Sequence, residues 1–403
     1  MIRARTTVLA VLLLGALLLP TWLTADGEIP AFARKYRVSC NVCHNPVPAM
    51  TDFGNTFAGN GFRFASGEQP RDTINTGDEL LDLAKNLPLA IRIDLYAQGI
   101  TNGDVGTDWK TPYNIKLMSG GTLSKKLSYY LYFFLFERGE IGGLEDAYIH
   151  YNNIADAEID VMVGQFQVSD PMFKRELRLS FQDYVIYRAE VGLQPADLTY
   201  DRGIMVPATF GGITATGLII NGNGKGEAQE DLQLDNNFAK NFFGHVTGDI
   251  APWLRLGAMG YAGKENGSVG GAPEVTNKLW MLGADATLSF GTVEINAQYA
   301  HREDDHPNFG VSDEVAKTNG GFAEVIWRPK QSRWYALALY NRIDCNQPLL
   351  NVRLGVPTNL ERYQTVTAGL GYVLRRNFRL LGEATWDTER EAALWTLGLV
   401  TAF

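Results

Sequence analysis

Apolar and polar residues alternate in many stretches of about ten residues from residue 89 to the end of the chain. The clearest of these stretches lie at 91–98, 146–151, 159–163 and 293–298. Successive side chains of a β-strand point to opposite faces, so this pattern predicts strands with one apolar and one polar face. Strands of this kind are typical of membrane barrels, in which the apolar face meets lipid and the polar face lines the lumen.

The connections between these stretches alternate in length. Short turns are expected near 124–126, 210–212, 249–253, 289–291, 329–333 and 375–377. Longer polar links are expected near 99–113, 168–202, 223–238, 264–276, 302–319 and 343–361. Short periplasmic turns and long external loops are typical of bacterial outer-membrane barrels. We therefore predict an all-β fold over 81–403, a transmembrane antiparallel barrel of about sixteen strands, in which 170–202 either hides a strand or fills the lumen.

The last ten residues form one more alternating strand. Trp395, Leu397, Leu399 and Phe403 share one face of it, and the chain ends on that aromatic residue. This ending resembles the assembly signal of outer-membrane proteins. A soluble β-sandwich is the alternative, but it explains neither the terminal Phe403 nor the alternation of turns and loops.

Residues 1–25 have the organisation of a cleavable signal peptide. Arg3 and Arg5 precede an apolar run at 8–19, and Ala25 offers a small residue at the cleavage site. The alternative is an uncleaved anchor, but the apolar run is short for a membrane span of ~20 residues. We therefore expect an exported chain that enters a membrane only as a barrel, with both termini on the periplasmic side.

Between the signal peptide and the barrel, Cys40, Cys43 and His44 form a C-x-x-C-H motif. This motif attaches a c-type haem through two thioether bonds, and its histidine is the proximal iron ligand. A disulfide or half of a zinc site are the alternatives. No second Cys/His pair lies nearby, and a disulfide leaves His44 without a role. We therefore predict one haem c; the third cysteine, Cys345, is expected as a lone thiol in a loop.

The residues around the motif follow the pattern FAR…CxxCH…P…FG..F…GF. Its members are Phe32-Ala33-Arg34, Pro46, Phe53-Gly54, Phe57 and Gly61-Phe62. The pattern resembles the fused outer-membrane cytochrome–porins of iron-oxidising bacteria, as does the stretch 164–179. This resemblance implies a monohaem domain over 26–80 that plugs the lumen or sits on the periplasmic side of the outer membrane. It also implies an iron(II) oxidoreductase that takes single electrons from extracellular Fe(II) and passes them to a periplasmic c-type cytochrome.

The aromatic residues near the motif have two interpretations. Phe53, Phe57, Phe62 and Phe64 either wall the faces of the haem or form a small core of their own. Both are compatible, because a domain of about fifty residues has little core besides a cofactor.

The sixth ligand of the haem iron stays open at this stage. Met50 lies close to the motif in sequence, and a thioether ligand would raise the haem potential. His150 and His245 belong to alternating stretches and are expected to face the lumen. A ligand of another kind, or an open position, is equally compatible with the sequence.

Two charged segments have an ordinary and a functional interpretation. His301, Asp304, Asp305 and His306 carry donor types that suit Fe(II), so a transient docking site is one interpretation and a solvated acidic loop the other. The basic run with Lys174, Arg175 and Arg178 either pairs with haem propionates, if its link folds inward, or forms a solvated patch.

Composition narrows the range of functions. The formal net charge is -9 and only 20% of the residues are charged, which argues against nucleic acid as a partner. A haem-bearing porin for solute diffusion and a conduit that delivers electrons outward remain alternatives. The direction of electron flow depends on the haem potential, which no residue pattern gives.

Overall fold

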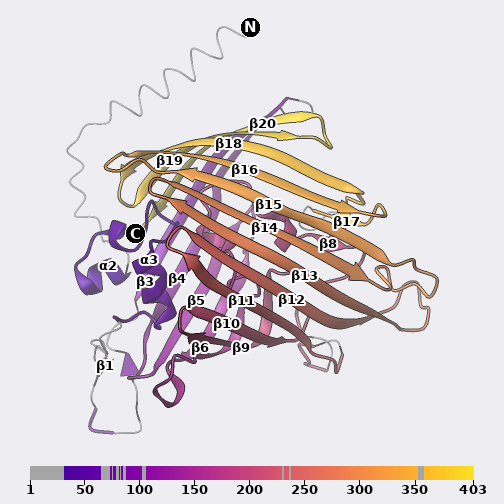
Figure 1. Cartoon of the computed structure of the whole chain (residues 1–403), viewed down its shortest axis with the longest axis horizontal. Coiled ribbons are helices and arrows are strands. Elements are labelled where there is room, and N and C mark those ends of the chain that lie inside the picture. Colours follow the sequence, from indigo (N-terminus) through magenta and orange to yellow (C-terminus); the bar gives the residue numbers. More distant parts are fainter. Residues whose placement is uncertain are drawn as a thin grey trace.

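The computed structural model describes residues 31–64, 73–74, 76–78, 81, 83–84, 88–101, 106–228, 231–235, 237–352 and 358–403 (Figure 1). The predicted signal peptide, 1–25, therefore lies outside the described residues. So does most of the segment that joins residue 64 to the barrel.

Sixteen strands of the described chain close into one antiparallel barrel, as predicted. Neighbouring strands follow the order of the sequence, and the last, β20 (Ala392–Ala402), pairs with the first, β3 (Leu89–Ile100). Between them lie β4 (Thr107–Thr122), β5 (Leu127–Glu137), β6 (Gly143–Tyr151), β7 (Val161–Gln167), β9 (Tyr200–Phe210), β10 (Ile213–Ile220), β11 (Asn241–Ala251), β12 (Leu254–Gly267), β13 (Val275–Phe290), β14 (Val293–Asp304), β15 (Ala316–Trp327), β16 (Trp334–Cys345), β18 (Arg362–Arg375) and β19 (Phe378–Asp387). A strand order without crossovers leaves no open edge in the wall.

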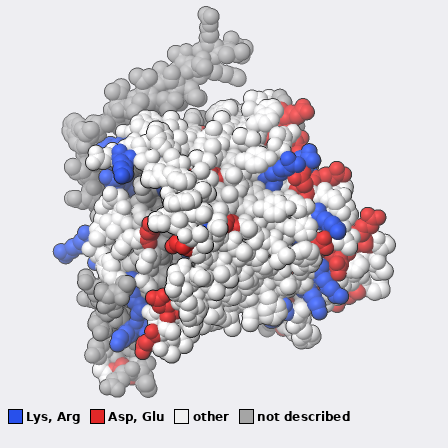
Figure 2. Space-filling view, in the orientation of Figure 1, with Lys and Arg blue, Asp and Glu red and all other residues white. Residues whose placement is uncertain are grey.

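The side chains of the wall alternate as the sequence predicts. On β13 and β14, Leu282 is 58% exposed on the outer surface, whereas Gln298 is 4% exposed on the inner one. Charged side chains are sparse across the middle of the outer surface and gather toward its two ends (Figure 2). Apolar residues outside and polar residues inside are the arrangement that a membrane barrel requires.

The connections divide the barrel into two ends. Tight turns join β4 to β5, β9 to β10, β11 to β12, β13 to β14, β15 to β16 and β18 to β19, at the six predicted places. The β6–β7 connection at this end is longer and contains the 3-10 turn η2 (Ile154–Asp156). We call this the short-turn end and the opposite one the long-loop end. An aromatic band marks the short-turn end, where Trp253 stacks on Phe290 and Trp334 lies against Tyr372.

The long link from β7 to β9, residues 168–199, folds into the lumen; we call it the inner loop. It contains η3 (Arg175–Leu177), η4 (Val185–Tyr187) and β8 (Glu190–Val191), which pairs with β17 (Leu350–Asn351) of a long loop. Of the two predicted alternatives, a hidden wall strand or a lumen filling, the second is therefore confirmed. The side chains of Leu179 and Tyr187 are fully buried among lumen-facing wall residues.

The N-terminal segment lies at the short-turn end. It contains α2 (Ala31–Tyr36), η1 (Cys40–Val42) and α3 (Asp52–Gly59). Among the described residues, no helix is long and apolar enough to cross a membrane. The N-terminal segment contacts the barrel at several points, and the clearest are Phe62, which stacks on Tyr130 of β5, and Ala49, which packs with Leu179 of the inner loop.

Candidate functional site

The C-x-x-C-H motif forms one compact turn. The backbone amides of Cys43 and His44 both donate to the carbonyl oxygen of Cys40, at 3.2 and 2.8 Å. Both thiols are free and partly buried, rather than joined as a disulfide. Burial raises the pKa of the Cys40 thiol, and the positive charge of Arg376, on the β18–β19 turn, partly offsets that rise.

The first turn of α3 holds this motif from behind. The hydroxyl of Thr51 accepts from the amide of Gly54, which caps the helix, and donates to the carbonyl oxygen of Val42 at 2.8 Å. The amide of Thr51 donates to the carbonyl oxygen of Cys43. Gly54 allows this approach, because a β-carbon there would lie 2.3 Å from the carbonyl oxygen of Cys43. Sequence reasoning missed Thr51, although a threonine before an aspartate is a recognisable helix start.

His44 is presented in the form that binds iron. Its Nδ1 lies 3.0 Å from the carbonyl oxygen of Pro48, so Nδ1 carries the proton and Nε2 keeps its lone pair. Burial lowers the pKa of the ring, which favours the neutral imidazole. A backbone carbonyl on the second ring nitrogen is the usual way in which proteins orient a ligating histidine.

The aromatic residues on both sides of the motif in sequence pack on one another and form a small core. Phe57 is their buried centre, in edge contacts with Phe32 and Tyr36. Phe53, directly after the helix start, remains 41% exposed. A covalently attached haem fits three features of this site. They are the two free thiols, the oriented imidazole of His44 and the exposed ring of Phe53. Cys40 and Cys43 would hold the vinyl groups of the haem, and His44 would bind its iron.

Met50 lies directly beside His44. The two residues face each other as an antiparallel bridge, flanked by hydrogen bonds from Thr51 to Cys43 and from Asn45 to Ala49. The Cα atoms of such a pair lie ~4.5 Å apart, and their side chains leave the same face. The pair therefore does not present its side chains from opposite sides, and ligation of iron by Met50 stays a prediction.

The two lumen histidines face inward, as predicted. His150 is buried and bonded to Asn152 at 2.9 Å. His245 is buried too, and its Nε2 lies 2.8 Å from Asp285, across the small Gly257 of β12. Each imidazole is therefore engaged in the hydrogen bonds of the wall, and ligation of iron by either stays a prediction.

The predicted Fe(II) docking residues do not form a common site. His301 points toward the outer surface, whereas Asp304 points inward, is fully buried and pairs with Arg302 at 2.6 Å. Asp305 and His306 follow in the next loop, where His306 bonds to a backbone carbonyl. Among the described residues, no group of three or more His, Cys, Asp or Glu side chains is placed to hold a metal ion. Strand alternation thus separates its members, and transient docking of Fe(II) at this loop stays a prediction.

The basic run of the inner loop is not a solvated patch. Arg175 is 7% exposed and donates to both carboxylate oxygens of Asp183. Arg178 lies 3.6 Å from the same carboxylate, and only Lys174 remains half exposed. The loop folds inward, but its arginines are paired within the loop rather than left for another anion. The prediction for Cys345 is also corrected, because it is buried at the end of β16.

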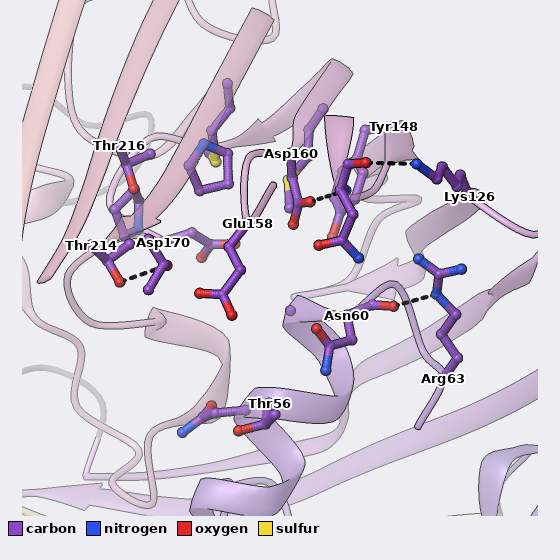
Figure 3. Close-up of a pocket in the computed structure, with 18 of the residues that line it drawn as sticks. Thr56, Asn60, Arg63, Lys126, Tyr148, Glu158, Asp160, Asp170, Thr214 and Thr216 are labelled. Atoms are coloured by element: carbon purple, nitrogen blue, oxygen red, sulfur yellow. Dashed lines mark hydrogen bonds between the residues drawn. The ribbon is translucent and has the colours of Figure 1, made fainter. Parts of the chain in front are cut away.

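A polar cavity of about 810 Å³ opens on the other side of α3 (Figure 3). Thr56 of α3 and Asn60, which follows that helix, face it opposite Glu158, Asp160 and Asp170. A second cavity, of about 740 Å³, adjoins the same helix and the inner loop. Neither cysteine of the motif lines either cavity, but Ala49 and Met50, which follow the motif, line the second one.

Comparisons with known proteins identify the fold alone. No protein-family model and no characterised protein matches the sequence. Among solved structures, the outer membrane channel DcaP of Acinetobacter baumannii is 12% identical, with a TM-score of 0.55, over 79% of this chain and 97% of that one. OmpF of Salmonella typhi gives 12% and 0.54, over 79% and 97%. A loop-deletion form of OmpT, an outer membrane protein of Vibrio cholerae, gives 12% and 0.51, over 79% and 99%. The sixteen-strand barrel of this chain therefore shares its fold with these outer-membrane proteins.

Proposed function

We propose that this protein is an outer-membrane cytochrome that carries single electrons through a closed barrel. Its donor would be extracellular Fe(II), and its acceptor a periplasmic c-type cytochrome. The observation that carries the proposal is the turn Cys40–His44 at the mouth of the barrel, with two free thiols and an oriented, neutral imidazole. The donor rests on the family resemblance of the segments around this turn.

The outer surface supports the membrane location. Apolar side chains cover the wall, and aromatic pairs such as Trp253–Phe290 mark the short-turn edge. Such bands of aromatic residues lie at the membrane–water interface. With an even number of strands and short turns inside, the N-terminal segment would face the periplasm, where c-type haem is attached.

The chain's own residues define what the site would do. A bound haem would supply an iron that accepts one electron from Fe(II), which leaves as Fe(III), and then passes it on. His44 would fix the iron through Nε2, while Pro48 holds the ring by its other nitrogen. The exposed Phe53, supported from behind by the buried Phe57, would exclude water from the group and thereby influence its potential.

The rival function, a porin for solute diffusion, agrees with the outer-membrane channels that share this fold, and the packing inside the lumen is our reason for preferring the electron carrier. The inner loop buries Tyr184 and Tyr187 against Phe322 of the wall, with Tyr184 and Phe322 stacked at 4.1 Å. β8 and β17 pair across the long-loop half of the lumen. An electron needs no continuous aqueous path across this packing, but a solute does.

One redox experiment tests the proposal. Purified full-length protein is oxidised and mixed with Fe(II) under anoxia, and the reduced haem bands are followed. We expect the bands to grow until the haem is reduced, and reduction that does not exceed a haem-free background would contradict the proposed donor. Liposomes containing the protein should exclude small sugars, whereas uptake at the rate of an open porin would favour the rival.

The same sample decides the direction of flow. A redox titration gives the haem potential, which we expect to lie above that of the Fe(III)/Fe(II) couple under the assay conditions. A potential well below this couple would favour the alternative, a conduit that delivers electrons outward.

A further inference from the structure

Five exposed basic side chains gather in one sector of the short-turn end, whereas the exposed Lys125 of the β4–β5 turn lies beyond β20 and β3. None of the five forms an ion pair with a described acidic residue. They belong to the end of α2, the β15–β16 turn and the β18–β19 turn, and are Arg37, Lys330, Arg333, Arg375 and Arg376. This concentration is unusual in a chain with a net charge of -9.

The sector lies beside the haem-attachment motif. Arg37 precedes Cys40 by only three residues. Arg328, at the base of the β15–β16 turn, donates to the carbonyl oxygen of Asn45 at 3.0 Å, so this turn touches the segment that follows His44. The β18–β19 turn carries Arg376, whose charge reaches the Cys40 thiol. Positive charge is therefore concentrated where an electron would leave the protein.

The opposite sector of the short-turn end lacks such a cluster of exposed basic side chains. Its turns, β9–β10, β11–β12 and β13–β14, are fully described and contain no charged residue in their tips. The one cation beside them, Arg255, pairs with Asp249 at 2.9 Å. Cations that served only to bind anionic lipid headgroups would follow the whole rim of the barrel, because lipid surrounds it evenly. Clustering beside the motif instead indicates a partner that approaches the motif.

We propose that this basic sector docks the acidic face of a soluble electron-carrier protein. The inference rests on the proposed function, because it assumes that Cys40–His44 carries a redox centre. Opposite charges steer two proteins together, raise their association rate by ~10–10³-fold and lose this effect as salt increases. Outer-sphere transfer needs only brief contact of the two redox centres, so charge rather than a large apolar interface suits such an encounter.

The test uses the full-length protein with its haem reduced by dithionite, so Fe(II) is not involved. After excess reductant is removed, the protein is mixed in a stopped-flow instrument with an oxidised blue-copper protein whose surface is acidic, or with a basic one. The loss of blue colour gives the second-order rate constant. A neutral quinone serves as a small oxidant that reports whether the haem itself still transfers electrons.

The variant K330E/R333E reverses two charges of the sector. The matched control, K264E/K278E, reverses two exposed lysines that are cross-strand neighbours near the long-loop end. We expect the variant to react with the acidic carrier ~10-fold more slowly at low salt, and the control to react like the wild type. All three should react equally with the quinone, and the wild-type rate should fall with salt only for the acidic carrier.

Two results would overturn the inference. One is a wild-type rate that is equal for the acidic and basic carriers and independent of salt. The other is a variant that reacts like the wild type but binds less to vesicles of phosphatidylglycerol, which would assign the sector to lipid. Failure of the proposed donor has a different signature, since the haem would then resist reduction by Fe(II) while the dithionite-reduced protein still responds to the charge of the carrier.

Discussion

One buried carboxylate, Asp183, ties the inner loop together inside the lumen. Asp183 accepts two hydrogen bonds from Arg175 and lies within 4 Å of Arg178 and Arg188. The change D183N keeps the size of this side chain but leaves three guanidinium groups without their shared counter-charge. Removing one partner of a buried ion pair costs about 3–5 kcal/mol, because the remaining charge stays desolvated.

The substitution destabilises the docked inner loop rather than the wall strands, because Asp183 and its arginine partners all belong to that loop. At the lower limit, about 3 kcal/mol corresponds to a factor of ~100 in the equilibrium between the docked and the displaced loop, at 1.4 kcal/mol per factor of ten. We expect D183N to raise the time-averaged conductance of planar bilayers by about this factor. Trypsin, which cleaves after arginine, should cut the variant at Arg175, Arg178 or Arg188 while the wild type stays intact.

The matched control is D344N. Asp344 also joins two arginines, Arg342 and Arg362, but all three side chains are at least 32% exposed at the long-loop end. Exposed pairs contribute about 1 kcal/mol or less, so D344N should conduct and resist trypsin like the wild type. If D183N were as closed and as resistant as the control, the ion pairs would not be what holds the inner loop in the lumen.

Three further predictions concern the pH dependence of the inner loop and two residues beside the haem-attachment motif. The arginine and lysine partners of Asp183 and Glu176 hold the pKa values of these carboxyls well below the usual carboxyl range. The two carboxylates therefore contribute to loop docking above pH ~4, and this contribution is lost only as the pH falls through the depressed pKa values. Conductance should stay constant between pH 7 and 4, and a channel that opened near pH 4–5 would contradict this. G54A should lower the haem-to-protein absorbance ratio several-fold, because the added methyl group meets the carbonyl oxygen of Cys43, whereas G59A, where nothing lies within 4 Å, should load haem normally; equal loading of the two would show that α3 does not support the motif. M50L should leave the axial-ligand spectrum and the haem potential unchanged, and loss of a methionine-ligation band on this change would identify Met50 as the sixth ligand.

The barrel wall was predictable from sequence because the two faces of each strand meet different environments. Lipid outside and polar lumen inside force a period of two, so the alternation of Val293 to Gln298 fixes both the strand and its faces. The turns were predictable for a related reason, since short turns must reverse the chain with residues such as Gly211 and Gly212, which both have positive φ. The expected link 99–113 was too long, because β4 already begins at Thr107.

The inner loop and the distal side of the haem site were not predictable in this way. Tyr184, Tyr187 and Leu198 follow no period, because each packs against lumen residues from strands far away in sequence. Asp183 looks like any loop aspartate until folding surrounds it with three arginines. The covalent half of the site was recognisable because C-x-x-C-H is local, whereas a sixth ligand depends on which distant residue folding brings to the opposite face.

The lumen contains cavities in its short-turn half and packed loops in its long-loop half, and this difference bears on the choice between electron and solute transfer. The cavities of the lumen, about 810 and 740 Å³, lie beside α3 in the short-turn half, while the long-loop half is filled by the inner loop and by the β8–β17 pair. A solute crossing the long-loop half would have to pass this loop, whose buried arginines are already paired. Ala49 and Leu179 share one apolar cluster with residues of the wall, so the inner loop and the segment that follows Cys40–His44 are fixed together. Such fixing is what the proposed redox centre would require.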